Sequence, residues 1–269
     1  MTAPLDNQTV SDYQRDGVTV LRGVFKDWVD TLRAGVEADM RNPDPKARSY
    51  DDPDGGGRFF VDYCNWSRIP EYRDFIFKSP AAQIAAQLMD SRKVQLFHEH
   101  VLVKEAQTGI PTPWHHDAPY YCVSSEKTVS LWVPLDEVPR ERTLEFVAGS
   151  HAWGKSFRPQ KFDGQALNAN DGLEPVPDID GEKESYDIVG WALSPGDALA
   201  FDYRTLHGAP ANTSASARRR AFSLRLVGDG ATFVRREGIV TSPPFPNVTL
   251  EHGDPLTGEE FPVLLSEAR

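Results

Sequence analysis

The sequence has few cysteines, no long apolar run and a deficit of positive charge. Its 269 residues include two cysteines, Cys64 and Cys122, which cannot supply a disulfide framework or a thiolate metal site. We expect both to be packing residues in a reducing compartment. No apolar run approaches the roughly 20 residues that span a membrane, and the first residues lack the basic-then-apolar pattern of a signal peptide. We therefore predict a cytoplasmic protein that does not enter a membrane.

The charge balance argues against nucleic acid as a partner. The formal net charge is −11, whereas binding to nucleic acid phosphates requires a basic surface. Apolar residues make up 39% of the chain and charged residues 26%, as in ordinary globular proteins. The length suits one β-rich domain, so we predict a single domain over 1–269 that acts on a small molecule. Oligomeric state is not predicted.

Turn-forming residues are frequent, with 21 prolines and 20 glycines, which is typical of many short strands. Residues 1–10 are expected to form a loose terminus, followed by a short helix that Ser11 caps. The spacing of apolar residues predicts helices over 26–41 and 81–89. A Pro- and Gly-rich loop is expected over 42–57. Strands are predicted over 18–21, 59–63, 94–104, 128–134, 143–147, 192–202 and 220–227.

Two later segments show little periodicity. Residues 154–188 carry many Asp, Glu, Gly and Pro residues. An irregular segment of that length in a compact domain is usually a lid, an insertion or disorder, and a lid or insertion is predicted. The Pro-rich tail from Val240 onward is expected to wrap the surface.

One motif indicates a metal site. The segment 111–117 reads Pro-Thr-Pro-Trp-His-His-Asp, and Leu206-His207-Gly208 follows about ninety residues later. On an extended strand His115 and Asp117 point the same way because side chains alternate. The same alternation turns His116 to the opposite face. With His207 they would make two imidazoles and one carboxylate, the facial triad of non-heme Fe(II) oxygenases. The alternative is that these are ordinary surface or core histidines.

The flanking residues favour the metal site. Ser-Pro-Gly-Asp at 194–197 and Ala-Leu-Ala-Phe at 198–201 predict a turn and a buried strand that leads to His207. A basic cluster, Arg218-Arg219-Arg220, opens a further apolar strand. Together these motifs resemble the phytanoyl-CoA dioxygenase family of Fe(II)/2-oxoglutarate oxygenases, and the resemblance runs from about Tyr13 to Gly228.

The resemblance implies a fold, a reaction and cofactors. The fold would be mainly β with flanking helices, around a double-stranded β-helix core of the jelly-roll, cupin-like type. The cofactors would be Fe(II), 2-oxoglutarate as co-substrate, and O2. The reaction would be hydroxylation of an unactivated C–H bond in a small metabolite, with release of succinate and CO2. His115, Asp117 and His207 would be the metal ligands and the catalytic residues.

The resemblance also implies an arginine that binds the distal carboxylate of 2-oxoglutarate. The fork of an Arg guanidinium suits a carboxylate. Counting eleven residues from His207 selects Arg218, whereas the Arg-x-Ala-x-Ser pattern selects Arg219. Arg219 is preferred because an insertion in the loop 213–217 costs little, while a register slip would turn over the whole strand. The alternative is a solvated basic run.

Three further residues are candidates to contact the co-substrate by resemblance: Trp132, His100 and Thr112. Plain core packing is the alternative for Trp132, and a buried, hydrogen-bonded pair with His98 is the alternative for His100. Ala209 stands where other members carry Ser, so that contact is expected to be absent.

Other residues are expected to shape the surroundings. His151, in Gly-Ser-His, is expected to be structural. Aromatic residues are candidates to line a substrate pocket beneath the lid, although they could equally be core: Tyr120, Tyr121, Phe59, Phe60 and Trp66.

Three other functions remain open. A metal-dependent isomerase or hydrolase would use the triad without an arginine for 2-oxoglutarate. A non-catalytic small-molecule sensor could keep the fold and tolerate loss of Asp117. A halogenase is disfavoured because related halogenases have a small residue at the position of Asp117, which leaves room for halide; an Asp there favours hydroxylation or desaturation.

Overall fold

The computed structural model describes residues 4–162, 164–168 and 171–266, and these form two facing antiparallel sheets with helices on one side. The larger sheet has eight strands in the order β1–β10–β7–β12–β4–β3–β2, and β14 pairs with β4. Their bounds are β1 Val18–Leu21, β2 Arg48–Asp51, β3 Arg58–Tyr63, β4 Lys93–Lys104, β7 Thr128–Pro134, β10 Ala198–Phe201, β12 Arg219–Val227 and β14 Val263–Ser266.

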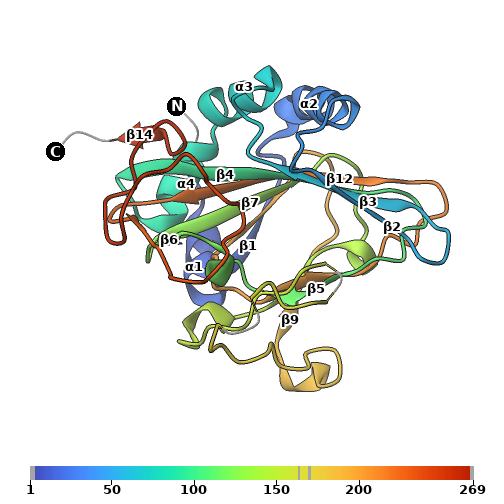
Figure 1. The fold of residues 1–269 in the computed structure, drawn as a ribbon. Coiled ribbons are helices and arrows are strands. Elements are labelled where there is room, and N and C mark those ends of the chain that lie inside the picture. The colour runs from blue at the N-terminus through green and yellow to red at the C-terminus, as the bar shows by residue number, and fades with distance from the viewer. Residues whose placement is uncertain (1–3, 163, 169–170, 267–269) are drawn as a thin grey trace.

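The smaller sheet has the order β5–β11–β8–β9, and a two-stranded sheet pairs β13 with β6. Their bounds are β5 Thr112–His115, β8 Glu145–Val147, β9 Ile188–Val189, β11 His207–Ala209, β6 Val123–Ser124 and β13 Thr232–Phe233. In Figure 1, β5 and β9 lie on the side of the larger sheet away from α2 and α3. Two antiparallel sheets whose strands cross over in this way form a double-stranded β-helix, so the predicted fold class is confirmed.

Helices cover the outer face of the larger sheet (Figure 1). They are α1 Asn7–Asp16, α2 Val29–Arg41, α3 Pro70–Lys78 and α4 Ala81–Met89, with short 3-10 turns at η1 Lys26–Trp28, η2 Ala118–Tyr120, η3 Arg140–Arg142, η4 Ser150–Ala152 and η5 Lys183–Ser185. Alternation along β4 separates the two faces of the sheet. Val101 and Val103 belong to the core beneath the helices, whereas His98, His100 and Leu102 line an interior cavity.

Several predicted elements need correction. Residues 1–3 of the predicted loose terminus lie outside the described residues. The rest of it is partly helical, because α1 begins at Asn7 and the Asp6 side chain accepts a hydrogen bond of 2.7 Å from the Thr9 amide. Asp6 therefore caps the helix in place of Ser11. The predicted loop 42–57 contains β2, the predicted strand 192–202 is restricted to 198–201, and α3 was not predicted. Short strands escape prediction because pairing with distant neighbours stabilises them.

The segment 154–188 is largely irregular, as expected, with one 3-10 turn over 183–185. Residues 163, 169 and 170 of this segment lie outside the described residues. The tail does more than wrap the surface, because β14 extends the larger sheet and residues 240–244 line the interior cavity. Within the described part of the chain, every helix is too short or too polar to cross a membrane.

Candidate metal centre and cavity

Strand pairing brings the two histidines together. His207 on β11 lies directly opposite His115 on β5 in the antiparallel register, so their side chains leave the sheet on the same face. The two ring centroids lie 4.3 Å apart. The His207 ring also packs against Phe146 and Phe201, which fixes its orientation.

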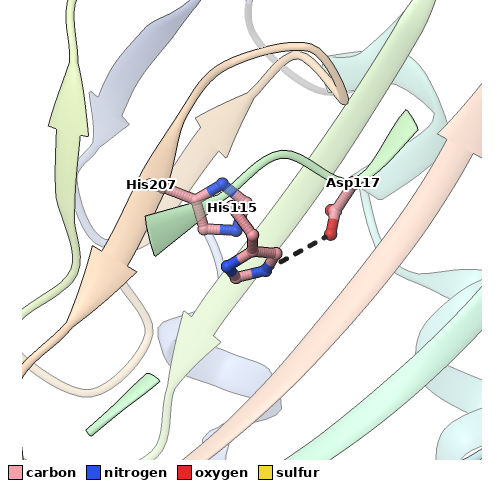
Figure 2. A group of neighbouring side chains, drawn as sticks. All are labelled: His115, Asp117 and His207. Carbon is pink, nitrogen blue, oxygen red and sulfur yellow. Dashed lines mark ion pairs between the residues drawn. The ribbon is translucent and has the colours of Figure 1, made fainter. Parts of the chain in front are cut away.

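Asp117 completes the cluster by a route that differs from the prediction. β5 ends at His115, and Asp117 has helical backbone angles as the residue before η2. The prediction that residues 115–117 form one extended strand is therefore wrong in detail. A turn of the chain after the strand still directs Asp117 towards the histidines (Figure 2), and Asp117 Oδ1 lies 3.8 Å from His115 Nε2.

The donor atoms of His115, Asp117 and His207 all lie within 4.8 Å of one another. His115 Nδ1 lies 2.8 Å from the Pro113 carbonyl oxygen, and His207 Nδ1 lies 2.9 Å from that of Thr205. When Nδ1–H donates to a carbonyl, Nε2 carries a free lone pair for a metal. His116 is excluded from the cluster, because its Nε2 accepts a hydrogen bond of 2.8 Å from the Phe157 amide.

The two carboxylate oxygens of Asp117 have different surroundings. Oδ1 faces His115, whereas Oδ2 accepts a hydrogen bond of 3.3 Å from Ser130 and lies 3.7 Å from Arg225 Nη2. Arg225 Nε also donates to the Tyr121 hydroxyl at 2.9 Å, and that hydroxyl bonds to Asp117 in turn. Such outer contacts orient a metal-binding carboxylate, and here they leave Oδ1 as the oxygen available to a metal.

The protonation states suit a divalent cation. Burial lowers the pKa of His207 to about 3 and also lowers the pKa of His115, so both imidazoles are neutral. Burial opposes ionisation of Asp117 most strongly, but Arg225, the two neighbouring imidazoles and the hydrogen bond from Tyr121 together hold the pKa of that carboxyl below its usual value. Metal ligands must be deprotonated, so two imidazoles and one carboxylate on one face fit Fe(II).

The metal centre opens into a cavity of about 390 Å³ between the two sheets. This is within the range of roughly 300–1,000 Å³ for small-molecule sites. His98, His100 and Leu102 contribute from β4, and Trp132 contributes from β7. The sheets therefore supply the inner wall of a site that admits a small molecule.

The structure separates the two candidate arginines. Arg219 lines the cavity and is 7% exposed, and within the described residues its guanidinium donates a hydrogen bond to the Arg142 carbonyl. Burial lowers its pKa to about 10. Arg218 points away, forming ion pairs of 2.9 Å with Glu37 and 3.1 Å with Glu105. Successive residues of β12 face opposite sides of the sheet, so Arg219 is the arginine that a molecule in the cavity can reach.

The remaining co-substrate candidates also line the cavity: Trp132, His100 and Thr112. His100 Nε2 and His98 Nδ1 are buried and have no hydrogen-bond partner among the described residues. Burial lowers the pKa of His100 to about 3, so the ring is neutral. Buried polar atoms usually have a partner, so these two ring nitrogens are available to a ligand in the cavity. Ala209 lines the cavity without a hydroxyl, as expected.

The five aromatic candidates fall into two groups. Tyr120 and Tyr121 line the cavity, whereas Phe59, Phe60 and Trp66 lie outside its lining. Phe60 and Trp66 face the core under the helices instead. His151 lies far from the metal centre and contacts the Gln14 carbonyl oxygen at 3.3 Å. Neither cysteine forms a disulfide.

Several lining residues were not predicted from the sequence. Arg225 shares a strand face with Arg219, six positions away, so the period of two was a usable signal. Others come from segments with no local signal. Tyr50, Phe162 and Leu167 are lining residues of this kind. They reach the cavity only because distant segments fold across it.

Solved structures share this architecture. A crystal structure of the epimerase SnoN, in complex with Fe3+, alpha ketoglutarate and nogalamycin RO, is 26% identical with a TM-score of 0.76, over 96% of this chain and 97% of that one. The alpha-ketoglutarate-dependent carbocyclase SnoK from nogalamycin biosynthesis is 23% identical with a TM-score of 0.74, over 97% and 99%. EctD from S. alaskensis, solved with 2-oxoglutarate and 5-hydroxyectoine, is 19% identical with a TM-score of 0.67, over 94% and 86%.

The sequence comparisons identify the family. No curated protein sequence matches the chain. The family model described as Phytanoyl-CoA dioxygenase (PhyH) matches residues 13–221, which is more than half of the chain and includes the metal centre and Arg219. The chain therefore belongs to the phytanoyl-CoA dioxygenase family.

Proposed function

We propose that this protein is an Fe(II)- and 2-oxoglutarate-dependent dioxygenase that hydroxylates a C–H bond of a small metabolite, releasing succinate and CO2. His115, Asp117 and His207 hold Fe(II) on one face and leave positions for 2-oxoglutarate and O2. When bound, the iron supplies the oxygen chemistry that breaks the C–H bond. The residues of the chain position the reactants and exclude water.

One observation carries the proposal: Arg219 is a buried cation in the cavity of the metal centre, without a carboxylate partner among the described residues. A buried charge is costly unless it is paired. A dicarboxylate that reaches from the metal to Arg219 would supply the missing partner. An isomerase, hydrolase or sensor that did not use 2-oxoglutarate would have no need for this cation.

The surrounding residues have distinct roles in this proposal. Arg225 lies beside Asp117 Oδ2 and donates a hydrogen bond to the Tyr121 hydroxyl, so that Oδ1 is presented to the iron. The free ring nitrogen of His100 provides a polar contact for the co-substrate. Trp132 and Thr112 limit its position from two other strands.

The segment 154–188 acts as a lid in this proposal. Tyr120, which follows the metal motif, donates a hydrogen bond of 2.6 Å to the Gln160 carbonyl and accepts one of 2.7 Å from its amide. His116 accepts from Phe157 of the same segment. These contacts tie the lid to the metal-binding segment and exclude water from the cavity.

Epimerisation is a second candidate reaction, because SnoN, at 26% identity, is described as an epimerase. Both reactions begin with removal of hydrogen from a carbon atom. They differ in the product, since hydroxylation adds one oxygen atom and epimerisation leaves the mass unchanged. Mass spectrometry of the product, beside a measurement of succinate, distinguishes them.

The first test is an anaerobic titration of Fe(II) and 2-oxoglutarate into metal-free protein, monitored by the visible charge-transfer band of the chelate. We expect a band in the wild type and in the control His151→Ala, whose histidine lies outside the site. The band should be absent in His207→Ala. Absence of the band in wild-type protein that has bound the metal would refute the use of 2-oxoglutarate.

A further inference from the structure

The charges that line the cavity do not follow the acidic character of the protein. Four cationic side chains line it, Arg48, Lys161, Arg219 and Arg225, whereas Asp117 is the only carboxylate among the described lining residues. The protein as a whole carries a net charge of −11. The cavity is therefore a positive site in a negative molecule.

Binding of Fe(II) and 2-oxoglutarate, as proposed above, does not remove this excess of positive charge. A divalent cation and the dianion 2-oxoglutarate cancel each other. Arg225 is paired with Asp117, and Arg219 faces the co-substrate in the proposed function. Two cations then remain for the second ligand of the cavity. These are Arg48 and Lys161, called here the rim cations.

The rim cations lie where the lid meets the edge of the larger sheet. Arg48 is two residues before Tyr50 on β2 and therefore faces the same side. Lys161 immediately precedes Phe162, whose ring lies 5.6 Å from that of Tyr50 between centroids. Both cations are exposed, and neither forms an ion pair with a carboxylate of the described residues. The Arg48 guanidinium donates only to the carbonyls of residues 46 and 47.

The space between the rim and the metal has apolar and aromatic walls. Tyr63 and Tyr120 lie towards the metal, since their rings contact those of His100 and His115, and Leu167 and Pro243 complete the lining. A ring-shaped apolar body fits such walls because aromatic side chains bind flat surfaces well. A charged group buried among them would lose its hydration without a partner.

We propose that the substrate is an organic anion with a ring-shaped apolar body, and that Arg48 and Lys161 bind its acid group at the rim. The acid group is a carboxylate, sulfonate or phosphate, which present the same oxygen acceptors to these cations. The oxidised carbon then lies at the end of the molecule remote from the acid group. This inference rests on the proposed function, because it assigns Arg219 to the co-substrate.

The test uses matched probes that differ only in charge, 2-naphthoate and 2-naphthamide. Each is titrated calorimetrically into full-length protein that holds Fe(II) and 2-oxoglutarate under anaerobic conditions, so that Arg219 is occupied and no turnover occurs. We expect wild-type protein to bind the acid about tenfold more tightly than the amide, as two partly exposed ion pairs allow. The preference should weaken with added salt.

Variants locate the acid group. In the double variant Arg48→Gln/Lys161→Gln, the acid should lose its advantage while affinity for the amide stays within about twofold, because only screened rim charges change. Lys155→Gln is the matched control, since Lys155 is an exposed cation of the same segment that does not line the cavity. It should retain the wild-type preference.

Three results would overturn the inference. Equal affinity of the wild type for the acid and the amide would show that the cavity does not recognise the charge of the ligand. A preference that survives the double variant would place the anion elsewhere, at Arg219 or Arg225. Failure of both probes to bind at millimolar concentration would exclude a ring-shaped body. Failure of the proposed function is distinguishable, because the charge-transfer band is recorded before either probe is added.

Discussion

The buried charge of Arg219 destabilises the free protein but favours binding of the 2-oxoglutarate dianion. The variant Arg219→Met separates these two effects. In the free protein the guanidinium is 7% exposed and its hydrogen bond goes to a neutral carbonyl, that of Arg142. Burial lowers the pKa of Arg219 from its usual value to about 10. A change of this size corresponds to about 3 kcal/mol of unfavourable charge burial.

Methionine removes that cost but leaves the Arg142 carbonyl without its donor, a loss of roughly 1–3 kcal/mol. The two effects offset each other. We therefore expect metal-free Arg219→Met to unfold within a few degrees of the wild type, since about 1 kcal/mol shifts the midpoint by roughly 2–4 °C in a protein of this size. The affinity for 2-oxoglutarate should fall sharply, because deleting one partner of a buried charge pair costs roughly 2–5 kcal/mol, or at least about 30-fold.

The assay compares thermal unfolding and calorimetric 2-oxoglutarate binding in anaerobic, Fe(II)-loaded protein. Arg218→Met is the matched control. It loses surface ion pairs with Glu37 and Glu105, which are worth at most about 1 kcal/mol, and should bind 2-oxoglutarate like the wild type. Unchanged affinity in Arg219→Met, or loss of affinity in Arg218→Met, would refute the assignment. A large fall in the stability of metal-free Arg219→Met would refute the argument about charge burial.

Three further variants test the metal-binding carboxylate, a buried carboxyl on β4 and the attachment of the lid. Arg225→Met removes the cation beside Asp117 Oδ2 and should weaken metal binding by about 10- to 100-fold; a competition titration with a metal chelator that gave the wild-type affinity would contradict this. Burial raises the pKa of Glu99 from 4.5 to about 8, so the folded protein retains a proton that the unfolded chain releases, and wild-type stability should fall as pH rises through this window. Glu99→Gln should therefore gain stability relative to the wild type between pH 5 and 8, on the order of a few kcal/mol. If the free energies of unfolding of the two proteins in urea differed by the same amount at both pH values, this prediction would be wrong. Tyr120→Phe removes both hydrogen bonds to Gln160 and should speed limited proteolysis within 154–188, whereas an unchanged cleavage rate would show that other contacts hold the lid.

The core elements and the metal motif were predictable because their signals are local. The alternation of side chains along the strands over 94–104 and 128–134 appears in the sequence itself, and so does the His-x-Asp spacing at 115–117. Short elements such as β2 and α1 were missed or misplaced. Their stability depends on pairing and packing, as when the mostly exposed strand 48–51 pairs with 58–61, so the residues of the element alone give little signal.

The sequence by itself determined the family, the fold class and which three side chains could bind a metal, since each depends on residue types at nearby positions. Only the tertiary structure decided which of two adjacent arginines, Arg218 or Arg219, faces the cavity. On a strand that choice depends on register, and register is set by pairing between strands far apart in the chain. The rim cations and residues 240–244 line the same cavity as the metal centre for the same reason. Folding brings these segments, which lie far apart in the chain, to the lining of one cavity, and no local pattern in the sequence predicts it.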